Sequence, residues 1–390
     1  MKTMTPRERL LAAIRFQGPD RVPACPRMWR YMLKHDGSQS EATYLKYADE
    51  VGLDPILLKY PGAANLMPPI ATESGRQRDV QVSVSRAKDG VYTVVSRCFE
   101  TPAGKLTERI KCPPKGSYFG IFPNNLVVEH LVKGPDDLPA LRCLIRAFLP
   151  APEKIPDYAA FAAEIGERGL TGMLVESALS YNAGDAYPQE QMMVAALDDP
   201  DFFNALIDIY HEPVMELVGR SLDRGARLIS GKFFYESISM GWSPEIYRRY
   251  FLPRVKDLVD LAHAHGAIYF HYDDGKVRDT IPMLREIGVD LLSTICPPPS
   301  GDVTPGEARA LAGRDMCLNG GIDTVGTMWR GTPEDVDCAV RDAIAAAALP
   351  EGGYIAGTSD SITEETPPAN FHAFFNAVQK YGKIAAAGGA

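Results

Sequence analysis

The chain has 390 residues, of which 45% are apolar and 23% are charged. These proportions are typical of a globular protein and exclude a fibrous or wholly disordered chain. With 41 Lys and Arg against 50 Asp and Glu, the formal net charge is −9. We therefore expect no binding to nucleic acid and none to anionic membranes, because both present negative charge.

No apolar run reaches the roughly 18 residues that a membrane span needs. The opening residues 1–16 indicate an amphipathic helix, because charges interrupt their apolar stretch. The seven cysteines are scattered widely and form no CxxC motif. This pattern argues against a disulfide framework and is typical of a protein of the reducing cytoplasm.

Eight short, nearly continuous apolar runs predict strands that are buried on both faces of a parallel sheet. Amphipathic helical patterns separate most of them, as at 244–264, 279–287 and 332–348. Strand and helix alternate along the chain, which predicts a (β/α)8 TIM barrel. The strands are expected at residues 22–27, 54–60, 170–177, 226–233, 267–272, 290–297, 316–323 and 353–359.

Residues 79–109 depart from this alternation. They follow a two-residue period, with Asp-Gly at 89–90 and Ala-Gly at 103–104. Such a pattern predicts antiparallel β-hairpins, here inserted after the second barrel strand. We expect one barrel domain over 1–390, with a frayed Ala/Gly tail at 384–390.

Barrel enzymes place their chemistry at the carboxyl ends of the strands. In the run FHYDDG, His271 and Asp273 are two residues apart and point to the same side of an extended segment. We interpret them as a metal site or a proton-transfer pair above the barrel, with a helix-capping pair as the alternative. Glu236, at the end of GKFFYE, is a candidate metal ligand or general acid/base, or else the partner of Lys232.

Two further carboxylates follow later strands. Asp323, in NGGID, is a candidate catalytic residue or the cap of the next helix. Asp360, in GTSDS, is a candidate metal ligand or the cap of the following turn. Aromatic side chains near the strand ends favour a flat, partly apolar ligand. The candidate substrate-binding residues are Arg27, Trp29, Tyr31, Tyr235 and Tyr272.

The order of motifs resembles that of the uroporphyrinogen-decarboxylase-like proteins. The similar segments are TPRERLLAAIRFQGPDRVP, SPEIYRRYFLPRVKDLV, a strand ending His-x-x-x-Gly, GVDLLS, NGGID, GTPEDV, GGYIAG and TPPANFHAFFNAVQKYGK. The resemblance implies a (β/α)8 barrel. The family includes porphyrinogen decarboxylases and cobalamin-dependent methyltransferases. PRMWRYMLKHDG lacks the decarboxylases' RQAGRY pattern, and ETPAGKLTER followed by VEHLVKGPDDLPAL is more similar to the methyltransferase branch.

Thiol-activating members of that branch bind zinc through a His-x-Cys pair and a later cysteine. Here the pair reads His271-x-Asp273, and no cysteine lies near 358–360. The resemblance therefore implies zinc held by His271 together with Glu236, Asp273 and Asp360. Oxygen and nitrogen ligands leave more positive charge on zinc than thiolates do, which suits polarising an ether oxygen.

The resulting hypothesis is a methyltransferase with Glu236, Asp273 and Asp323 as catalytic residues. It is similar to members that demethylate methoxylated aromatic compounds and hand the methyl group to a corrinoid protein. Because DxHxxG is absent, the cobalamin is expected on that separate partner. The resemblance also implies a homodimer. The alternatives are a metal-free decarboxylase of a tetrapyrrole or another carboxylate, and a barrel that only binds such a ligand.

Overall fold

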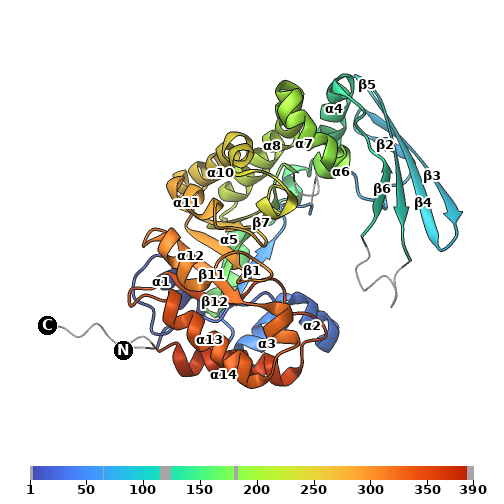
Figure 1. Cartoon of the computed structure of the whole chain (residues 1–390). Helices are drawn as coiled ribbons and strands as arrows, with labels where there is room; N and C mark the ends of the chain where they lie inside the picture. Colours follow the sequence, from blue (N-terminus) through green and yellow to red (C-terminus); the bar gives the residue numbers. More distant parts are fainter. Residues whose placement is uncertain (1–2, 65, 115–123, 180–182, 384–390) are drawn as a thin grey trace. The chain divides into compact units, whose positions relative to one another are not determined.

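The computed structural model describes residues 3–64, 66–114, 124–179 and 183–383 (Figure 1). The chain divides into two compact units. The first, called the barrel unit, comprises 1–61, 156–175 and 218–390, and the second, the insertion unit, comprises 62–155 and 176–217. The expected single domain over 1–390 stays a prediction, and the tail 384–390 lies outside the described residues.

The barrel unit is built on a parallel sheet in which seven described strands lie in the order β1-β7-β8-β9-β10-β11-β12 (Figure 1). Most of their residues are buried, as continuous apolar runs predict. Seven of the predicted strands are confirmed. They are β1 (Ile56–Lys59), β7 (Leu170–Glu176), β8 (Leu228–Lys232), β9 (Ile268–Tyr272), β10 (Leu291–Ile295), β11 (Cys317–Ile322) and β12 (Tyr354–Thr358).

The segment predicted as the first strand, 22–27, closes the ring between β12 and β1. The amide of Cys25 donates to the carbonyl of Ala356 at 2.9 Å, and the carbonyl of Ala24 accepts from the amide of Asp54 at 2.8 Å. Ala24 and Ala356 form an isolated parallel bridge and not a full strand ladder. Pro23 and Pro26 explain the difference, since proline has no N–H to donate. This segment is the eighth member of the ring, in addition to the seven strands, and the predicted (β/α)8 barrel is confirmed.

Helices follow the barrel strands. The predicted helix over 244–264 is interrupted by the π-helix η6 (Tyr247–Phe251), and the one over 332–348 begins with a capping box at Thr332. The helices of this unit are α1 (Pro6–Ile14), α2 (Trp29–Asp36), α3 (Glu41–Val51), α5 (Tyr158–Ile165), α9 (Pro244–Ile246), α10 (Leu252–Ala264), α11 (Thr280–Glu286), α12 (Pro305–Ala312), α13 (Pro333–Ala347) and α14 (Pro368–Tyr381).

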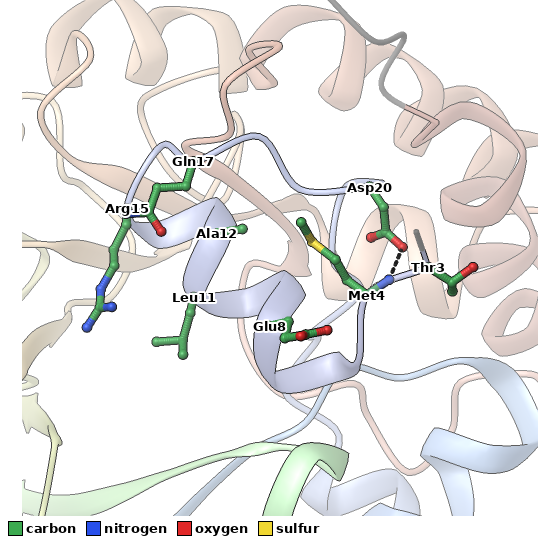
Figure 2. Close-up of a pocket in the computed structure, with 8 residues that line it drawn as sticks. All are labelled: Thr3, Met4, Glu8, Leu11, Ala12, Arg15, Gln17 and Asp20. Carbon is green, nitrogen blue, oxygen red and sulfur yellow. Dashed lines mark hydrogen bonds between the residues drawn. The ribbon is translucent and has the colours of Figure 1, made fainter. Parts of the chain in front are cut away.

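Helix α1 closes the amino-terminal end of the barrel. Its Leu10 and Ile14 belong to one buried cluster with Leu228, Leu291 and Cys317, which are the first residues of their strands. A pocket of about 450 Å³ lies beside this helix and is lined by Thr3, Met4, Glu8, Leu11, Ala12, Arg15, Gln17 and Asp20 (Figure 2). The carboxyl ends of the strands, where a barrel site is expected, are at the opposite end.

The insertion unit contains an antiparallel sheet in the order β2-β3-β4-β5-β6. It follows β1, so the predicted hairpins after the second barrel position are confirmed. The sheet extends beyond 79–109, because short strands flank the two hairpins. Its strands are β2 (Gly75–Gln77), β3 (Val80–Asp89), β4 (Tyr92–Thr101), β5 (Gly104–Cys112) and β6 (Leu126–Glu129).

Helix α4 (Leu138–Phe148) packs on one face of this sheet. The Phe99 ring on β4 lies 6.4 Å from the Phe148 ring, in an edge-to-face arrangement. The unit also contains α6 (Gly184–Ala186), α7 (Gln189–Asp198) and the first part of α8 (Pro200–Asp223). All seven cysteines are free thiols. Among the described residues, every helix is too short or too polar to cross a membrane.

Candidate functional site

The two sides of β9 face different surroundings. Ile268 and Phe270 belong to the cluster inside the barrel, together with residues of α1. Because side chains alternate along a strand, Tyr272 faces the same interior, while Tyr269 and His271 face the surrounding helices. Tyr272 is the last residue of the strand. It therefore lies at the mouth, the carboxyl end of the barrel.

Arg27, Tyr272 and Asp360 meet at this mouth. A terminal nitrogen of Arg27, Nη1, lies 2.9 Å from Oδ1 of Asp360 and also donates to the Tyr272 hydroxyl. The same hydroxyl lies 3.5 Å from Oδ1 of Asp360. The Arg27 guanidinium also lies over the Tyr272 ring, 4.3 Å from its centre. Three predicted site residues are thus brought together by the closing segment, β9 and the turn after β12.

Asp274 and Lys232 extend the cluster at the mouth. Burial, and then the charge of Asp360, raise the pKa of Asp274 to about 6, although Tyr272, Arg27 and Lys232 act in the opposite direction. Such a carboxyl exchanges a proton near neutral pH, and groups of this kind are concentrated at functional sites. Neither residue is among the site residues predicted from the sequence, where Lys232 stands only as a possible partner of Glu236. Their positions could have indicated them, because both share the side of Tyr272. Asp274 follows Tyr272 by two residues, and Lys232 pairs with Tyr272 in the β8–β9 register.

His271 and Asp273 share a side of β9, as predicted, but that side faces away from the mouth. His271 is completely buried, and its ring stacks on Phe233 with the centres 4.8 Å apart. Burial lowers the pKa of His271 to about 3, so the ring is neutral. Asp273 is also completely buried, which raises the pKa of its carboxyl well above the usual value. Both side chains are therefore packed in the interior of the protein, and their role as a metal site or proton-transfer pair stays a prediction.

The expected zinc ligands do not form one group. Among the described residues, no three His, Cys, Asp or Glu side chains are placed so that they could hold a metal ion. Asp360 is paired with Arg27, and its side chain is 55% exposed, whereas His271 is completely buried. Glu236 is buried, and its charge contributes to the raised pKa of Asp273. The residues do not fit zinc, and the metal roles of His271, Glu236, Asp273 and Asp360 stay predictions.

Asp323 caps the helix that follows β11, which is the alternative role that the sequence suggested for it. Its carboxylate accepts a hydrogen bond from the amide of Gly326, at the start of the π-helix η7 (Thr324–Trp329). Burial among charged neighbours that include Asp323, Asp274 and Asp360 raises the pKa of the Cys296 thiol to about 11. This thiol is therefore not a ready nucleophile. The catalytic role of Asp323 stays a prediction.

The remaining predicted aromatic residues have mixed positions. The Tyr31 ring is buried and stacks on Phe371 with the centres 4.3 Å apart, so it contributes to packing between α2 and α14. Trp29 begins α2, and its ring lies 5.7 Å from the guanidinium carbon of Arg30. The carbonyl of Tyr235 accepts the indole N–H of Trp242 at 2.5 Å. Tyr272, by contrast, contacts both Arg27 and Asp360.

Comparison with known proteins gives one family match. The family model described as uroporphyrinogen decarboxylase (URO-D) matches residues 180–381, which is more than half of the chain. A methylated-thiol–coenzyme M methyltransferase from Methanosarcina mazei is 26% identical over 199 residues, or 51% of this chain and 50% of the relative. The chain thus matches about half the length of this curated relative.

A solved structure supports the fold over nearly the whole chain. A methyltransferase from Methanosarcina mazei superposes with a TM-score of 0.60 at 14% sequence identity. The similarity covers 97% of this chain and 99% of that one. At 14% identity the likeness shows a shared fold and nothing more specific.

Proposed function

This chain belongs to the uroporphyrinogen decarboxylase family, and we propose that it is a methyltransferase that moves a methyl group from a small donor to a corrinoid protein. The methyltransferase name of the Methanosarcina mazei relative supports this class of reaction. The observation that carries the proposal is the cluster of Arg27, Tyr272, Asp274 and Asp360 at the barrel mouth. A cation, a phenol and a titratable carboxyl at this end support the proposal, because TIM-barrel enzymes carry their active sites at the carboxyl ends of the strands.

The proposed donor is a methoxylated aromatic compound. The guanidinium carbon of Arg27 lies over the Tyr272 ring, 4.3 Å from its centre, so a cation and an aromatic ring are held together at the mouth. A flat ring fits such surroundings, because aromatic and guanidinium planes stack favourably. The methoxy oxygen would then lie near the polar groups of the same cluster.

Methyl transfer from an aryl ether breaks the bond between carbon and oxygen. The electron pair of that bond stays on the oxygen, and the methyl carbon forms its new bond to the nucleophilic cobalt that the partner protein supplies. Negative charge therefore develops on the leaving oxygen. Arg27 stabilises that charge, since a preorganised cation acts strongly in a partly buried site. Asp274, with its pKa of about 6, supplies the proton for the released phenolate. No step is assigned to zinc, because its expected ligands are not gathered.

The test is methyl transfer to free cob(I)alamin in the presence of the purified protein. A panel of methoxybenzoates is offered as substrates, and both products are measured. Methylcobalamin and the demethylated phenol should form in equal amounts. Arg27→Gln should lower kcat/KM at least tenfold, whereas Arg30→Gln, which changes an arginine paired with Glu364, should leave it unchanged. Release of carbon dioxide from a porphyrinogen, with no methyl transfer, would replace this proposal by the decarboxylase alternative.

Partner and assembly complete the proposal. Cobalamin is carried by a separate corrinoid protein, and the chain itself forms a homodimer. Both follow from the family resemblance and not from a contact in this structure. A cytoplasmic location, expected from the scattered cysteines, also stays a prediction.

A further inference from the structure

The barrel strand β10 contains a strained residue close to the cluster at the mouth. Thr294 has a φ of 66°, which lies in the left-handed region that a β-branched residue rarely adopts. The register of β10 against β11 also shifts between Leu292 and Ile295, where β10 contains one residue more than its neighbour. This extra residue makes a β-bulge. Strained residues persist only where their surroundings hold them, and they are concentrated at functional sites.

The Thr294 side chain contacts the end of β9. Ser293 and Tyr272 are the last pair of the β9–β10 ladder, so Asp273 is the next residue of β9 that needs a partner. The Thr294 hydroxyl donates to the carbonyl of Asp273 and also lies 2.6 Å from the carbonyl of Ser293. Because Thr294 is completely buried, water does not compete for these acceptors. A side chain thus replaces the backbone of β10 as the partner of this strand end.

Hydrogen bonds hold the backbone on both sides of Asp274. On one side, Thr294 binds the carbonyl of Asp273, and the amide of Asp274 donates to Oδ1 of Asp273 at 2.8 Å. On the other side, the carbonyl of Asp274 accepts from Oγ of Ser237 at 2.8 Å and from Oγ of Ser239 at 2.9 Å. The place of the Asp274 carboxyl at the mouth therefore depends on these contacts.

The other residue of the bulge is linked to the segment that carries Arg27. Oγ of Ser293 donates to Oδ1 of Asn319 at 3.0 Å. Nδ2 of Asn319 donates to the carbonyl of Cys25 at 3.2 Å, two residues before Arg27. Buried hydrogen bonds of this kind are costly to leave unmade, so they fix the groups that they join. The bulge in β10 is therefore connected to the segments of both the acid and the cation of the mouth.

We propose that Thr294 is a positioning residue, whose hydroxyl holds Asp274 where its carboxyl can protonate the leaving oxygen. In the proposed function, on which this inference rests, Asp274 supplies the proton and Arg27 stabilises the charge. A proton donor must lie within hydrogen-bond distance of the atom that it protonates. Loss of the Thr294 hydroxyl therefore slows the reaction, whereas binding of the donor, which depends on Arg27 and Tyr272, is kept.

The test compares three substitutions of Thr294 with a matched control. Thr294→Val removes the hydroxyl and keeps the branched shape, and Thr294→Gly removes it while relieving the strained φ. Both should lower kcat for methyl transfer from a methoxybenzoate to cob(I)alamin about tenfold, with KM within about twofold of wild type. Thr294→Ser keeps the hydroxyl and should recover most of the loss. Thr280→Val removes another buried hydroxyl, which donates to the carbonyl of Val277 at 3.2 Å, and should leave kcat unchanged.

Two further measurements separate positioning from a general loss of structure. A methoxynitrobenzoate releases a more acidic phenol, which needs the proton less, so the loss in Thr294→Val should shrink to within about threefold. In a protein that already carries Asp274→Asn, Thr294→Val should cause no further loss, because the two residues act as a unit. A merely structural defect would slow both substrates equally and would add to the effect of Asp274→Asn.

Hydrogen exchange tests the same contact without the reaction. Deuterium uptake of the segment 273–276 should be faster in Thr294→Val than in wild type or in Thr294→Ser. Equal uptake in wild type and Thr294→Val would overturn the inference, whichever reaction the protein catalyses. If the wild type transfers no methyl group, the proposed function is wrong, and uptake alone decides whether Thr294 holds Asp274. If Thr294→Val or Thr294→Gly reacts as fast as wild type, the proposed function stands and Thr294 is not a positioning residue.

Discussion

Arg27 and Asp360 lie 333 positions apart in the chain, yet they form an ion pair of 2.9 Å at the barrel mouth. The backbone brings them there, because the amide of Ile362 donates to the carbonyl of Arg27 at 2.7 Å. This contact lies beyond the isolated parallel bridge between Ala24 and Ala356, which closes the barrel. The charge arrangement of the mouth therefore depends on the seam at which the first and last parts of the barrel meet.

Removal of the Asp360 carboxylate should impair the proposed reaction through Arg27. In Asp360→Ala, the guanidinium loses the acceptor that orients it, so we expect kcat/KM for a methoxybenzoate to fall about tenfold. Methylcobalamin formation from free cob(I)alamin is the measurement. Glu364→Ala is the matched control, because it removes the carboxylate that pairs with another arginine, Arg30 on α2. Equal rates in wild type and Asp360→Ala would contradict a role for this ion pair.

Asp274 predicts a pH dependence of stability. Its pKa is about 6 in the folded chain against 3.8 for an ordinary Asp, with burial as the first cause. Between these values the folded state holds a proton that the unfolded state has lost. The contribution of this group to stability is therefore complete below the unfolded pKa and is lost as the pH rises through about 6.

Asp274→Asn should remove that dependence, because an amide does not titrate in this range. We expect the variant to gain in stability relative to wild type between about pH 4 and about pH 8. Urea unfolding at the two pH values measures the difference. If the difference in free energy of unfolding between variant and wild type is instead the same at both pH values, or shifts toward wild type at the higher pH, Asp274 is not the protonated group.

Most of the barrel could be predicted from the sequence, because a strand buried on both faces has a continuous apolar run. The bounds of β8 to β12 lie within two residues of the predicted ones. The segment 22–27 was harder, since its prolines interrupt pairing without changing its apolar character. In the insertion, β2 and β6 were missed because they are short and largely exposed.

The site was predictable only in part, because the sequence does not show which alternate side chains of β9 face the barrel interior. In HYDD, polar side chains stand at positions of both parities, so the pattern pairs His271 with Asp273 and Tyr272 with Asp274 equally well. Only the packing of Ile268 and Phe270 inside the barrel distinguishes the two sides. Such a choice depends on tertiary contacts, which one sequence does not contain.

The position of His271 predicts that packing outweighs metal binding at this residue. Because the ring is neutral, buried and stacked on Phe233, His271→Phe should keep most of the stability of the wild type. His271→Ala leaves a cavity and should lower the free energy of unfolding by about 3 kcal/mol. Zinc content, measured in the same three proteins, should not differ. One zinc ion per wild-type chain that both variants lose would instead support the metal site expected from the sequence.

The buried ion pair of the antiparallel sheet gives the sharpest stability test. Arg97 and Glu108 face one another across β4 and β5, and both are at most 4% exposed. Nε of Arg97 lies 2.6 Å from Oε1 of Glu108, and Nη1 donates to the carbonyls of Pro68 and Pro69 at 2.9 and 2.7 Å. The guanidinium thus holds the chain after β1 onto the sheet, and the carboxylate compensates its charge.

Glu108→Ala should lower the free energy of unfolding of the insertion unit by about 3–5 kcal/mol, because it leaves a buried cation without a counter-charge. Glu100→Ala, at an exposed position of β4, should change it by no more than about 0.5 kcal/mol. The double variant Arg97→Met, Glu108→Leu should regain most of the loss, since a well-packed apolar pair removes both buried charges. Urea unfolding followed by limited proteolysis within 75–112 locates the effect. A single variant as stable as the control would mean that water reaches Arg97 and that the pair is not buried in solution.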